Sequence, residues 1–152
     1  MGIQIVKQAD YRVVLSSKVE GLEKEFGIAI SDEVTRMKER TLSGKDINNK
    51  AFKPYTEAYR RFRVEGSRNS KTGKKKGGGR QGSPPNLEFT GKMRTSIVFK
   101  IFKQGTNYIA EVFFNGSKEE QKAKGNLKHR QFFGFSKDQI AKIHQRIKQS
   151  FK

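Results

Sequence analysis

The sequence predicts an α+β fold: a long N-terminal helix packed on a small antiparallel sheet with a central hairpin at about 96–114, a C-terminal helix and a long basic loop. Two apolar stripes at helical spacing and two adjacent segments of alternating apolar residues carry this prediction. The chain has 152 residues, the usual size of one domain. We therefore expect a single domain over 1–152 with a flexible basic insertion at about 66–86.

Two short segments near the N-terminus have a composition that suits strands. Residues 3–5 are Ile-Gln-Ile and residues 12–15 are Arg-Val-Val-Leu, and a polar turn at 8–10 separates them. Such a pair predicts either a hairpin or a loose N-terminal arm. The sequence leaves both alternatives open.

A long helix is predicted next. Ser17 and Glu20 have the spacing of a capping box, in which each side chain satisfies a free backbone donor of the other residue. An apolar stripe at steps of three and four then predicts a helix that runs to Gly44. The stripe consists of Val19, Leu22, Phe26, Ile30, Val34, Met37 and Thr41. Gly27 and the Ser-Asp-Glu cluster at 31–33 can bend or divide this helix, because Gly weakens a helix and Ser-Asp favours a cap.

The region between this helix and the predicted sheet is mostly polar. Residues 45–53 are rich in Asn and predict a loop, and residues 56–62 predict a short helix after a proline. Three aromatic residues are spaced by four and three positions along this helix and share one face of it: Tyr55, Tyr59 and Phe62. A further helical turn is predicted at 90–95.

The segments 96–102 and 108–114 are the best strand candidates, and the turn at 104–107 between them predicts an antiparallel hairpin. One face of the hairpin would carry Ile97, Phe99, Ile101, Tyr108, Ala110, Val112 and Phe114. The other face would carry Val98, Phe102, Ile109 and Phe113. Apolar residues on both faces indicate that both are at least partly covered, by helices or by a neighbouring subunit.

The C-terminal part predicts two helices. The first covers 117–123 and ends at Gly125-Asn126, after which the aromatic segment 130–135 returns to the core. A second capping box at 136–139 opens the last helix. Its buried stripe consists of Ile140, Ile143, Ile147 and Phe151.

Charge is distributed unevenly along the chain. The formal net charge is +18, yet residues 1–43 sum to zero, so the excess lies beyond them. No acidic residue occurs in the densest basic stretch, 67–83, whose cations are Arg68, Lys71, Lys74, Lys75, Lys76 and Arg80. With five glycines and no apolar residue, this stretch is not expected to fold alone. No run of 18 apolar residues occurs and no signal-peptide pattern opens the chain, so we expect neither a membrane span nor secretion.

Three interpretations of the basic loop stay open. It can bind nucleic acid by neutralising phosphates, dock on an acidic protein surface, or be a solvated insertion. Aromatic residues are not interleaved with its cations, which disfavours a dedicated RNA-reading surface.

No catalytic or metal-binding pattern stands out. The absence of Cys excludes disulfides, thiolate ligands and a Cys nucleophile. His129 and His144 are too few for a convincing metal site. The Gly-Lys pairs at 73–74 and 91–92 lack the hydroxyl residue of a phosphate-binding loop, and the adjacent acids at 119–120 point about 100° apart on a helix. We therefore expect no enzyme, no cofactor and no metal.

Several segments occur in a recognisable order. They are Phe52-Lys53-Pro54-Tyr55 followed by Tyr59, Pro85-Asn86-Leu87-Glu88-Phe89-Thr90-Gly91-Lys92-Met93 leading into Ser96-Ile97, Lys122-Ala123-Lys124-Gly125-Asn126, and Arg130-Gln131-Phe132-Phe133-Gly134-Phe135-Ser136. This order resembles the phage virion morphogenesis proteins, also called tail completion proteins. The resemblance covers roughly 17–151 and rests on motif order. In that family an Arg-Pro-Phe-like segment precedes a Ser-capped helix that closes the domain, and here Gln131 stands where proline is common.

The resemblance implies a structural virion protein of a tailed bacteriophage. It would be a non-enzymatic homo-oligomer, a six- or twelve-fold ring at the head–tail junction, assembled in the host bacterial cytoplasm. It would contact neighbouring neck, connector or tail-tube proteins, and the basic loop would touch an adjoining ring or the packaged DNA. A small basic nucleic-acid-binding protein is the alternative from another class.

Overall fold

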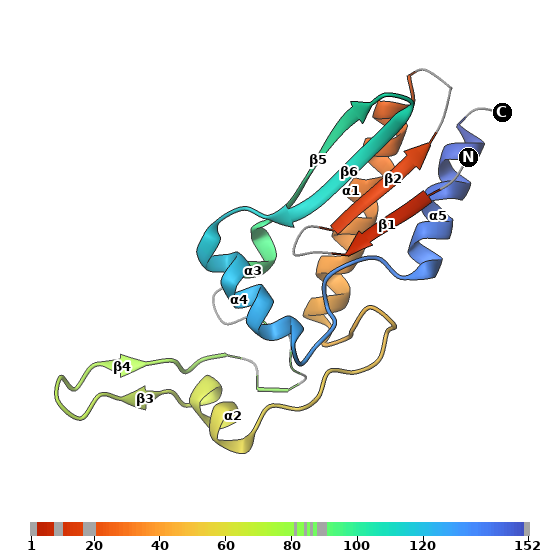
Figure 1. Cartoon of the computed structure of the whole chain (residues 1–152). Coiled ribbons are helices and arrows are strands. Elements are labelled where there is room, and N and C mark those ends of the chain that lie inside the picture. Colours follow the sequence, from red (N-terminus) through yellow and green to blue (C-terminus); the bar gives the residue numbers. More distant parts are fainter. Residues whose placement is uncertain are drawn as a thin grey trace.

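The computed structural model describes residues 3–7, 11–16, 21–80, 82–83, 85, 87 and 91–150. The elements, in chain order, are β1 (Ile3–Lys7), β2 (Tyr11–Ser16), α1 (Leu22–Leu42), α2 (Glu57–Val64), β3 (Ser67–Arg68), β4 (Lys75–Lys76), α3 (Lys92–Thr95), β5 (Ile97–Gln104), β6 (Asn107–Phe114), α4 (Ser117–Leu127) and α5 (Lys137–Gln149). Helices combine with an antiparallel sheet, so the predicted α+β class is confirmed (Figure 1).

The main sheet has four antiparallel strands in the order β1-β2-β6-β5. The predicted central hairpin is confirmed, and its turn is tighter than expected, because Gln104 pairs with Asn107 across the two residues Gly105 and Thr106. Of the two N-terminal alternatives, the hairpin is the one that forms. Strand β2 lies against β6, which joins the N-terminal hairpin to the central one.

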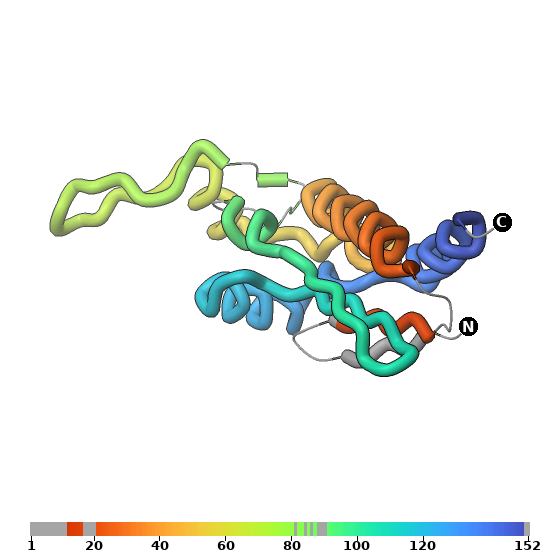
Figure 2. Tube along the Cα trace, turned by 90° about the horizontal axis from the view of Figure 1, so that it is seen from above, coloured from red at the N-terminus to blue at the C-terminus, as the bar shows by residue number. Residues whose placement is uncertain are grey.

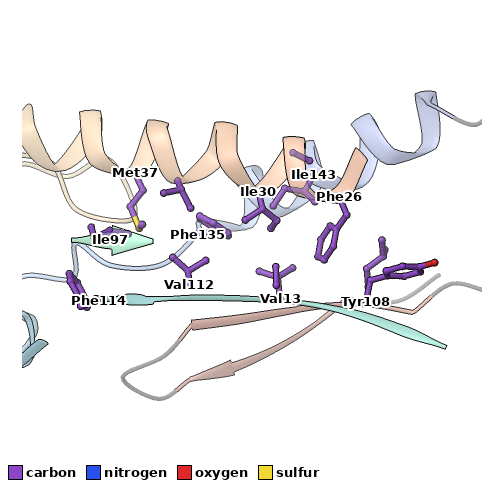
Figure 3. Packing of buried hydrophobic residues seen from close by; sticks show 14 of the residues in the cluster. Val13, Phe26, Ile30, Met37, Ile97, Tyr108, Val112, Phe114, Phe135 and Ile143 are labelled. Carbon is purple, nitrogen blue, oxygen red and sulfur yellow. The ribbon is translucent and has the colours of Figure 1, made fainter. Parts of the chain in front are cut away.

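Helices α1 and α5 cover one face of this sheet (Figures 1 and 2). Figure 3 shows Phe26, Ile30 and Met37 of α1 pointing toward strand residues that include Val13 and Val112. All five side chains are at most 1% exposed. Burying each such large apolar side chain contributes about 1.5–3 kcal/mol, so this layer dominates the stability of the fold.

Helix α1 follows the predicted stripe but begins later than expected. Its N-cap is Gly21, which has a left-handed conformation with φ of 77°, and the helix begins at Leu22. The capping box predicted at 17–20 lies outside the described residues, as does Val19 of the stripe. The helix continues without interruption through Gly27 and the cluster at 31–33, so neither divides it. Packing of the stripe outweighs the poor helix propensity of these residues.

The C-terminal elements agree with prediction in their main features. The capping box of α5 is formed, since Ser136 and the side chain of Gln139 satisfy each other's backbone amides. Ile143 and Ile147 are buried, whereas Phe151 lies outside the described residues. Helix α4 passes through 125–126, where it was predicted to end, and continues to Leu127. The adjacent acids of α4 form ion pairs with lysines of the same helix, in keeping with a role as helix charge.

A buried polar network fixes α5 and the segment before it on α1. The side-chain amide of Gln139 donates to Glu33 at 2.7 Å and its oxygen accepts from Arg40 at 2.7 Å. Arg40 also donates to the carbonyls of Phe132 and Gly134, at 2.9 and 3.1 Å. Glu33 is only 2% exposed. These bonds satisfy groups whose burial would otherwise be costly, so they determine one position for the C-terminal helix.

Candidate functional site

The predicted basic loop contains a hairpin, which we call the basic arm (residues 66–80). Strands β3 and β4 pair antiparallel, with Ser67 opposite Lys76 and Arg68 opposite Lys75. The side chain of Asn69 shapes the tip, because its oxygen accepts from the backbone amides of residues 71 and 72 at 2.9 and 3.0 Å. Figures 1 and 2 show the arm extending away from the sheet and its helices. Local turn chemistry therefore gives a ribbon where composition alone predicts a loop.

The returning strand of the arm is anchored on the end of α2. The backbone amides of residues 78, 79 and 80 donate to the carbonyls of residues 62, 64 and 63, at 3.2, 2.9 and 2.9 Å. A helix end leaves such carbonyls without partners inside the helix. Gly77, with φ of 78°, lies so close that a Cβ there would come within 2.8 Å of the Phe62 ring. A side chain at Gly77 is therefore incompatible with this anchoring.

All six predicted cations of the arm are exposed: Arg68, Lys71, Lys74, Lys75, Lys76 and Arg80. The pairing places Arg68 directly opposite Lys75. Like charges in this position repel each other, and two unit charges about 5 Å apart in water repel by roughly 1 kcal/mol. Binding of an anionic surface would relieve this repulsion.

The acidic residue nearest the start of α2 is already engaged within that helix. Glu57 accepts hydrogen bonds from Arg60 at 2.8 and 2.9 Å and from Arg61 at 3.1 Å. These bonds lower the pKa of Glu57 to about 2, and the bond from Arg60 has the larger effect. Glu57 thus stays ionised and neutralises charge on α2 itself.

A pocket of about 590 Å³ is lined by residues of the arm-bearing helix α2, of α3 and of α4, and of the chain beside these helices. None of the six arm cations lines it. Its lining comprises Lys53, Pro54, Tyr55, Thr56, Tyr59, Arg63, Leu87, Gly91, Met93, Arg94, Lys122, Asn126, His129 and Arg130. Among the lining residues that the structure describes, six are basic or histidine and none is acidic. The pocket is therefore a second basic region beside the arm.

The face of the sheet turned away from α1 and α5 carries an apolar row. Val14, Ile109 and Phe102 lie side by side on β2, β6 and β5. Val98 and Phe113 form a second pair on the same face. Ile109 is 9% exposed and the other four are half-buried. Helices α1 and α5 lie on the opposite side of the sheet (Figure 2), while Val98, at one end of this face, lines a small pocket together with Lys118 and Glu119 of α4.

A buried carboxylate sits in the middle of that face. Glu111 is 5% exposed and pairs with Arg12 at 2.6 Å and with Lys100 at 2.5 Å, from the strands on either side. The hydrogen bond from Lys100 is the main cause that lowers the pKa of Glu111, and the bond from Arg12 adds to it. Lys100 also lies over the Phe102 and Phe113 rings, at 5.8 and 5.6 Å from their centroids. This face is therefore apolar with a fixed ionic centre, and we call it the open face.

No family model matches the sequence, and no curated protein or solved structure matches the chain. Within the described residues, no group of three His, Asp or Glu side chains is placed to hold a metal ion. In the same ranges, no helix combines the length and apolar character needed to cross a bilayer.

Sequence reasoning found the arm but missed the pocket. Tyr55 and Tyr59 were recognised as the aromatic face of a short helix and as part of the family resemblance, and His129 only as an isolated histidine. The Lys and Arg residues of the pocket are widely separated along the chain: Lys53, Arg63, Arg94, Lys122 and Arg130. Single cations at such separations carry no local pattern, so only the tertiary structure brings them together around one pocket.

Proposed function

We propose that this chain is a structural virion protein of a tailed bacteriophage. In this proposal it forms a ring in the neck or at the end of the tail, as a head–tail connector or tail terminator component, and joins head to tail around the DNA channel without catalysis. Six- or twelve-fold rings at the head–tail junction are the assemblies that the family resemblance implies.

The observation that carries the proposal is the open face. Val14, Phe102 and Phe113 are half-buried beside a carboxylate with two cationic partners, on the sheet face opposite the described helices α1 and α5. A small domain gains stability when a neighbouring copy covers such a surface. Repetition of one such contact around a closed symmetry axis gives a ring. We assign the neighbouring copy as the occupant of this face.

The arm suits a contact between layers of the assembly. It extends beyond the sheet and helices, and its six exposed cations form a concentrated positive surface. Such a surface would bind acidic residues of an adjoining neck, connector or tail-tube ring, or the packaged DNA. The exclusion of acidic residues from the arm favours binding to partners of opposite charge over contacts between arms.

The oligomeric state of two matched variants tests the ring. Phe102→Gln/Phe113→Gln removes apolar groups from the open face, whereas Ile28→Gln/Leu42→Gln removes two apolar groups that are 36% and 38% exposed on α1. We expect the first variant to lose rings in light scattering and negative-stain microscopy and the second to keep them, with both still folded by circular dichroism. A wild-type chain that stays monomeric, alone and with neck or tail proteins, would refute the proposal. So would particles that join heads to tails normally without the protein.

A small basic nucleic-acid-binding protein is the second candidate, and the like charges paired across the arm favour it. Duplex DNA binding measured across a salt series tests it. Changing Lys74, Lys75, Lys76 and Arg80 to Gln should weaken binding and reduce the slope of log K against log salt by about 3–4, since each phosphate contact contributes about 0.9. Undetectable binding at low salt would eliminate this candidate.

A further inference from the structure

The pocket at the root of the arm concentrates positive charge on a concave surface. Five of its lining residues are Lys or Arg: Lys53, Arg63, Arg94, Lys122 and Arg130. Lys122 forms an ion pair with Glu119 at 3.0 Å. Burial, and to a smaller extent the positive charge of Arg94, lower the pKa of Lys38 on α1. A pocket of this charge favours an anionic ligand.

Two guanidinium groups in the pocket are held in place by one aromatic ring. Arg63 lies 5.0 Å and Arg130 lies 5.2 Å from the centroid of the Tyr55 ring. The hydroxyl of Tyr55 accepts from the backbone amide of Leu87 at 3.2 Å, and Arg130 donates to the carbonyl of Lys53 at 3.0 Å. The Nε of Arg130 is buried and has no hydrogen-bond partner among the described residues. Arg63 is only 1% exposed, so Arg130 is the more accessible of the two fixed guanidinium groups, and such a group suits the planar, paired recognition of phosphate oxygens.

An exposed aromatic ring borders these cations. Tyr59 is 40% exposed, although it packs edge-on against Tyr55 at a centroid distance of 5.0 Å. Aromatic rings beside basic groups are the surfaces on which proteins stack unpaired bases. The pocket volume of about 590 Å³ also falls within the range of small-molecule sites.

We infer that this pocket binds a nucleotide, with its phosphate held by Arg94, Arg130 and Lys122 and its base stacked on Tyr59. The nucleotide can be free or part of a single strand of nucleic acid, and both sources present the same phosphate and base. This site differs from a phosphate-binding loop, because side chains rather than glycine-loop amides supply the donors. An acidic peptide would use the guanidinium groups but would give the exposed tyrosine no role.

Titration of the full chain at low salt tests the inference. The ligands are inorganic phosphate, adenosine monophosphate, a short single-stranded oligonucleotide and a glutamate-rich peptide. Binding of each is measured by calorimetry and by NMR. We expect saturable binding of the mononucleotide that is stronger than that of inorganic phosphate, because the base adds stacking. Tighter binding of the oligonucleotide would identify the single strand as the source, and equal binding per site would identify the free nucleotide.

Four variants separate phosphate binding from stacking and from net charge. Arg130→Gln should weaken both phosphate and mononucleotide by about tenfold or more, whereas Tyr59→Ala should weaken only the mononucleotide. Lys128→Gln removes one charge from an exposed position next to the pocket and outside its lining, and should change neither affinity by more than about twofold. Because Arg130 also contacts Tyr55, Lys122→Gln repeats the phosphate test at an exposed lining residue.

Three results would overturn the inference. The first is the absence of saturable phosphate or mononucleotide binding to the folded wild-type chain. The second is an equal loss of affinity in Lys128→Gln and Arg130→Gln, which would reduce the effect to net charge. The third is peptide binding that exceeds nucleotide binding and persists in Tyr59→Ala. None of these results bears on ring formation, since the open face shares no residue with the pocket.

Discussion

The main sheet with helices α1 and α5, which we call the body, and the basic arm keep their shapes by different means. In the body, α1 lays a continuous apolar stripe on the sheet, and residues such as Phe26 and Ile30 are fully buried. The described arm contains no buried apolar side chain, and its shape comes from the turn at Asn69 and from amides bonded to the end of α2. Core packing is cooperative across a domain, whereas turn and terminus bonds act locally. The arm can therefore vary in charge without affecting the stability of the body.

The largest expected effect is a core truncation in the body. Phe26→Ala should lower the free energy of unfolding by about 3–5 kcal/mol, because it removes a fully buried ring and leaves a cavity. Denaturant titration measures the loss. Ile28→Ala, two residues away and 36% exposed, should cost less than about 1 kcal/mol.

The arm provides the contrasting control for that measurement. Lys74→Gln/Lys75→Gln/Lys76→Gln should change the free energy of unfolding by less than about 0.5 kcal/mol, since all three side chains are exposed. If the arm variant unfolds as readily as Phe26→Ala, the distinction between the two regions fails.

A smaller effect is expected from the ionic centre of the open face. The pKa of Glu111 is lowered in the folded protein, mainly by Lys100, from its ordinary value of 4.5. A lowered carboxyl pKa contributes stability that is present above the unfolded pKa and is lost as the pH falls through the folded pKa. Wild-type stability should therefore decline as the pH is lowered from about 5. At neutral pH, Glu111→Gln should cost about 1 kcal/mol, because the two cations left behind are half exposed and stay hydrated.

Denaturant titrations of both proteins at neutral and acidic pH check this dependence. The difference in unfolding free energy between wild type and Glu111→Gln should shrink as the pH falls below 4.5, because protonation removes the ionic bonds from the wild type as well. A difference that stays constant with pH would show that the ion pairs do not supply the stability, and would leave packing as the role of this residue.

The body was largely predictable from sequence because its signals are local and periodic. The stripe of α1, the alternation in β5 and β6 and the capping box of α5 each lie within one segment. Pairing of β2 with β6 was not predictable, since Arg12 and Glu111 are 99 residues apart. The alternation of apolar residues in a strand does not indicate which other strand it pairs with. The start of α1 was misplaced because the N-cap is Gly21, whose left-handed backbone is not helical, so the helix begins at Leu22.

The arm and the pocket were predictable only in part. The cations of the arm were evident from composition, but its ribbon depends on one Asn turn and on glycines that fit against α2. These details give no periodic signal. The pocket is lined by residues of α2, α3, α4 and the loops beside them, which only the tertiary structure brings together.

A local effect is expected at the root of the arm. Gly77→Ala forces a side chain to within 2.8 Å of the Phe62 ring at a positive φ, so the arm should detach from α2. Hydrogen exchange of the amides at 78–80 should accelerate by about tenfold or more, while the unfolding free energy of the body changes by less than about 1 kcal/mol.

Gly79→Ala is the matched control for the root. It has φ of 63° but no atom within 4 Å of the added Cβ, so it introduces the same backbone strain without the clash. Its amide exchange should change less than that of Gly77→Ala. Equal acceleration in the two variants would mean that backbone strain alone controls the anchoring, and that contact with Phe62 does not.

The smallest net change in unfolding free energy is expected at Gly27 of α1, where a local helix-propensity term opposes a packing term. In Gly27→Ala, the gain in helix propensity of about 1 kcal/mol opposes a contact of 3.3 Å between the new Cβ and Cδ1 of Ile101. The two terms should nearly cancel, so the change in unfolding free energy should stay within about 0.5 kcal/mol. Ile101→Val removes the opposing methyl, so the double variant should be more stable than the sum of the single variants predicts. Strict additivity in this cycle would show that α1 shifts to accommodate the Cβ, and that Gly27 does not set the distance between α1 and β5.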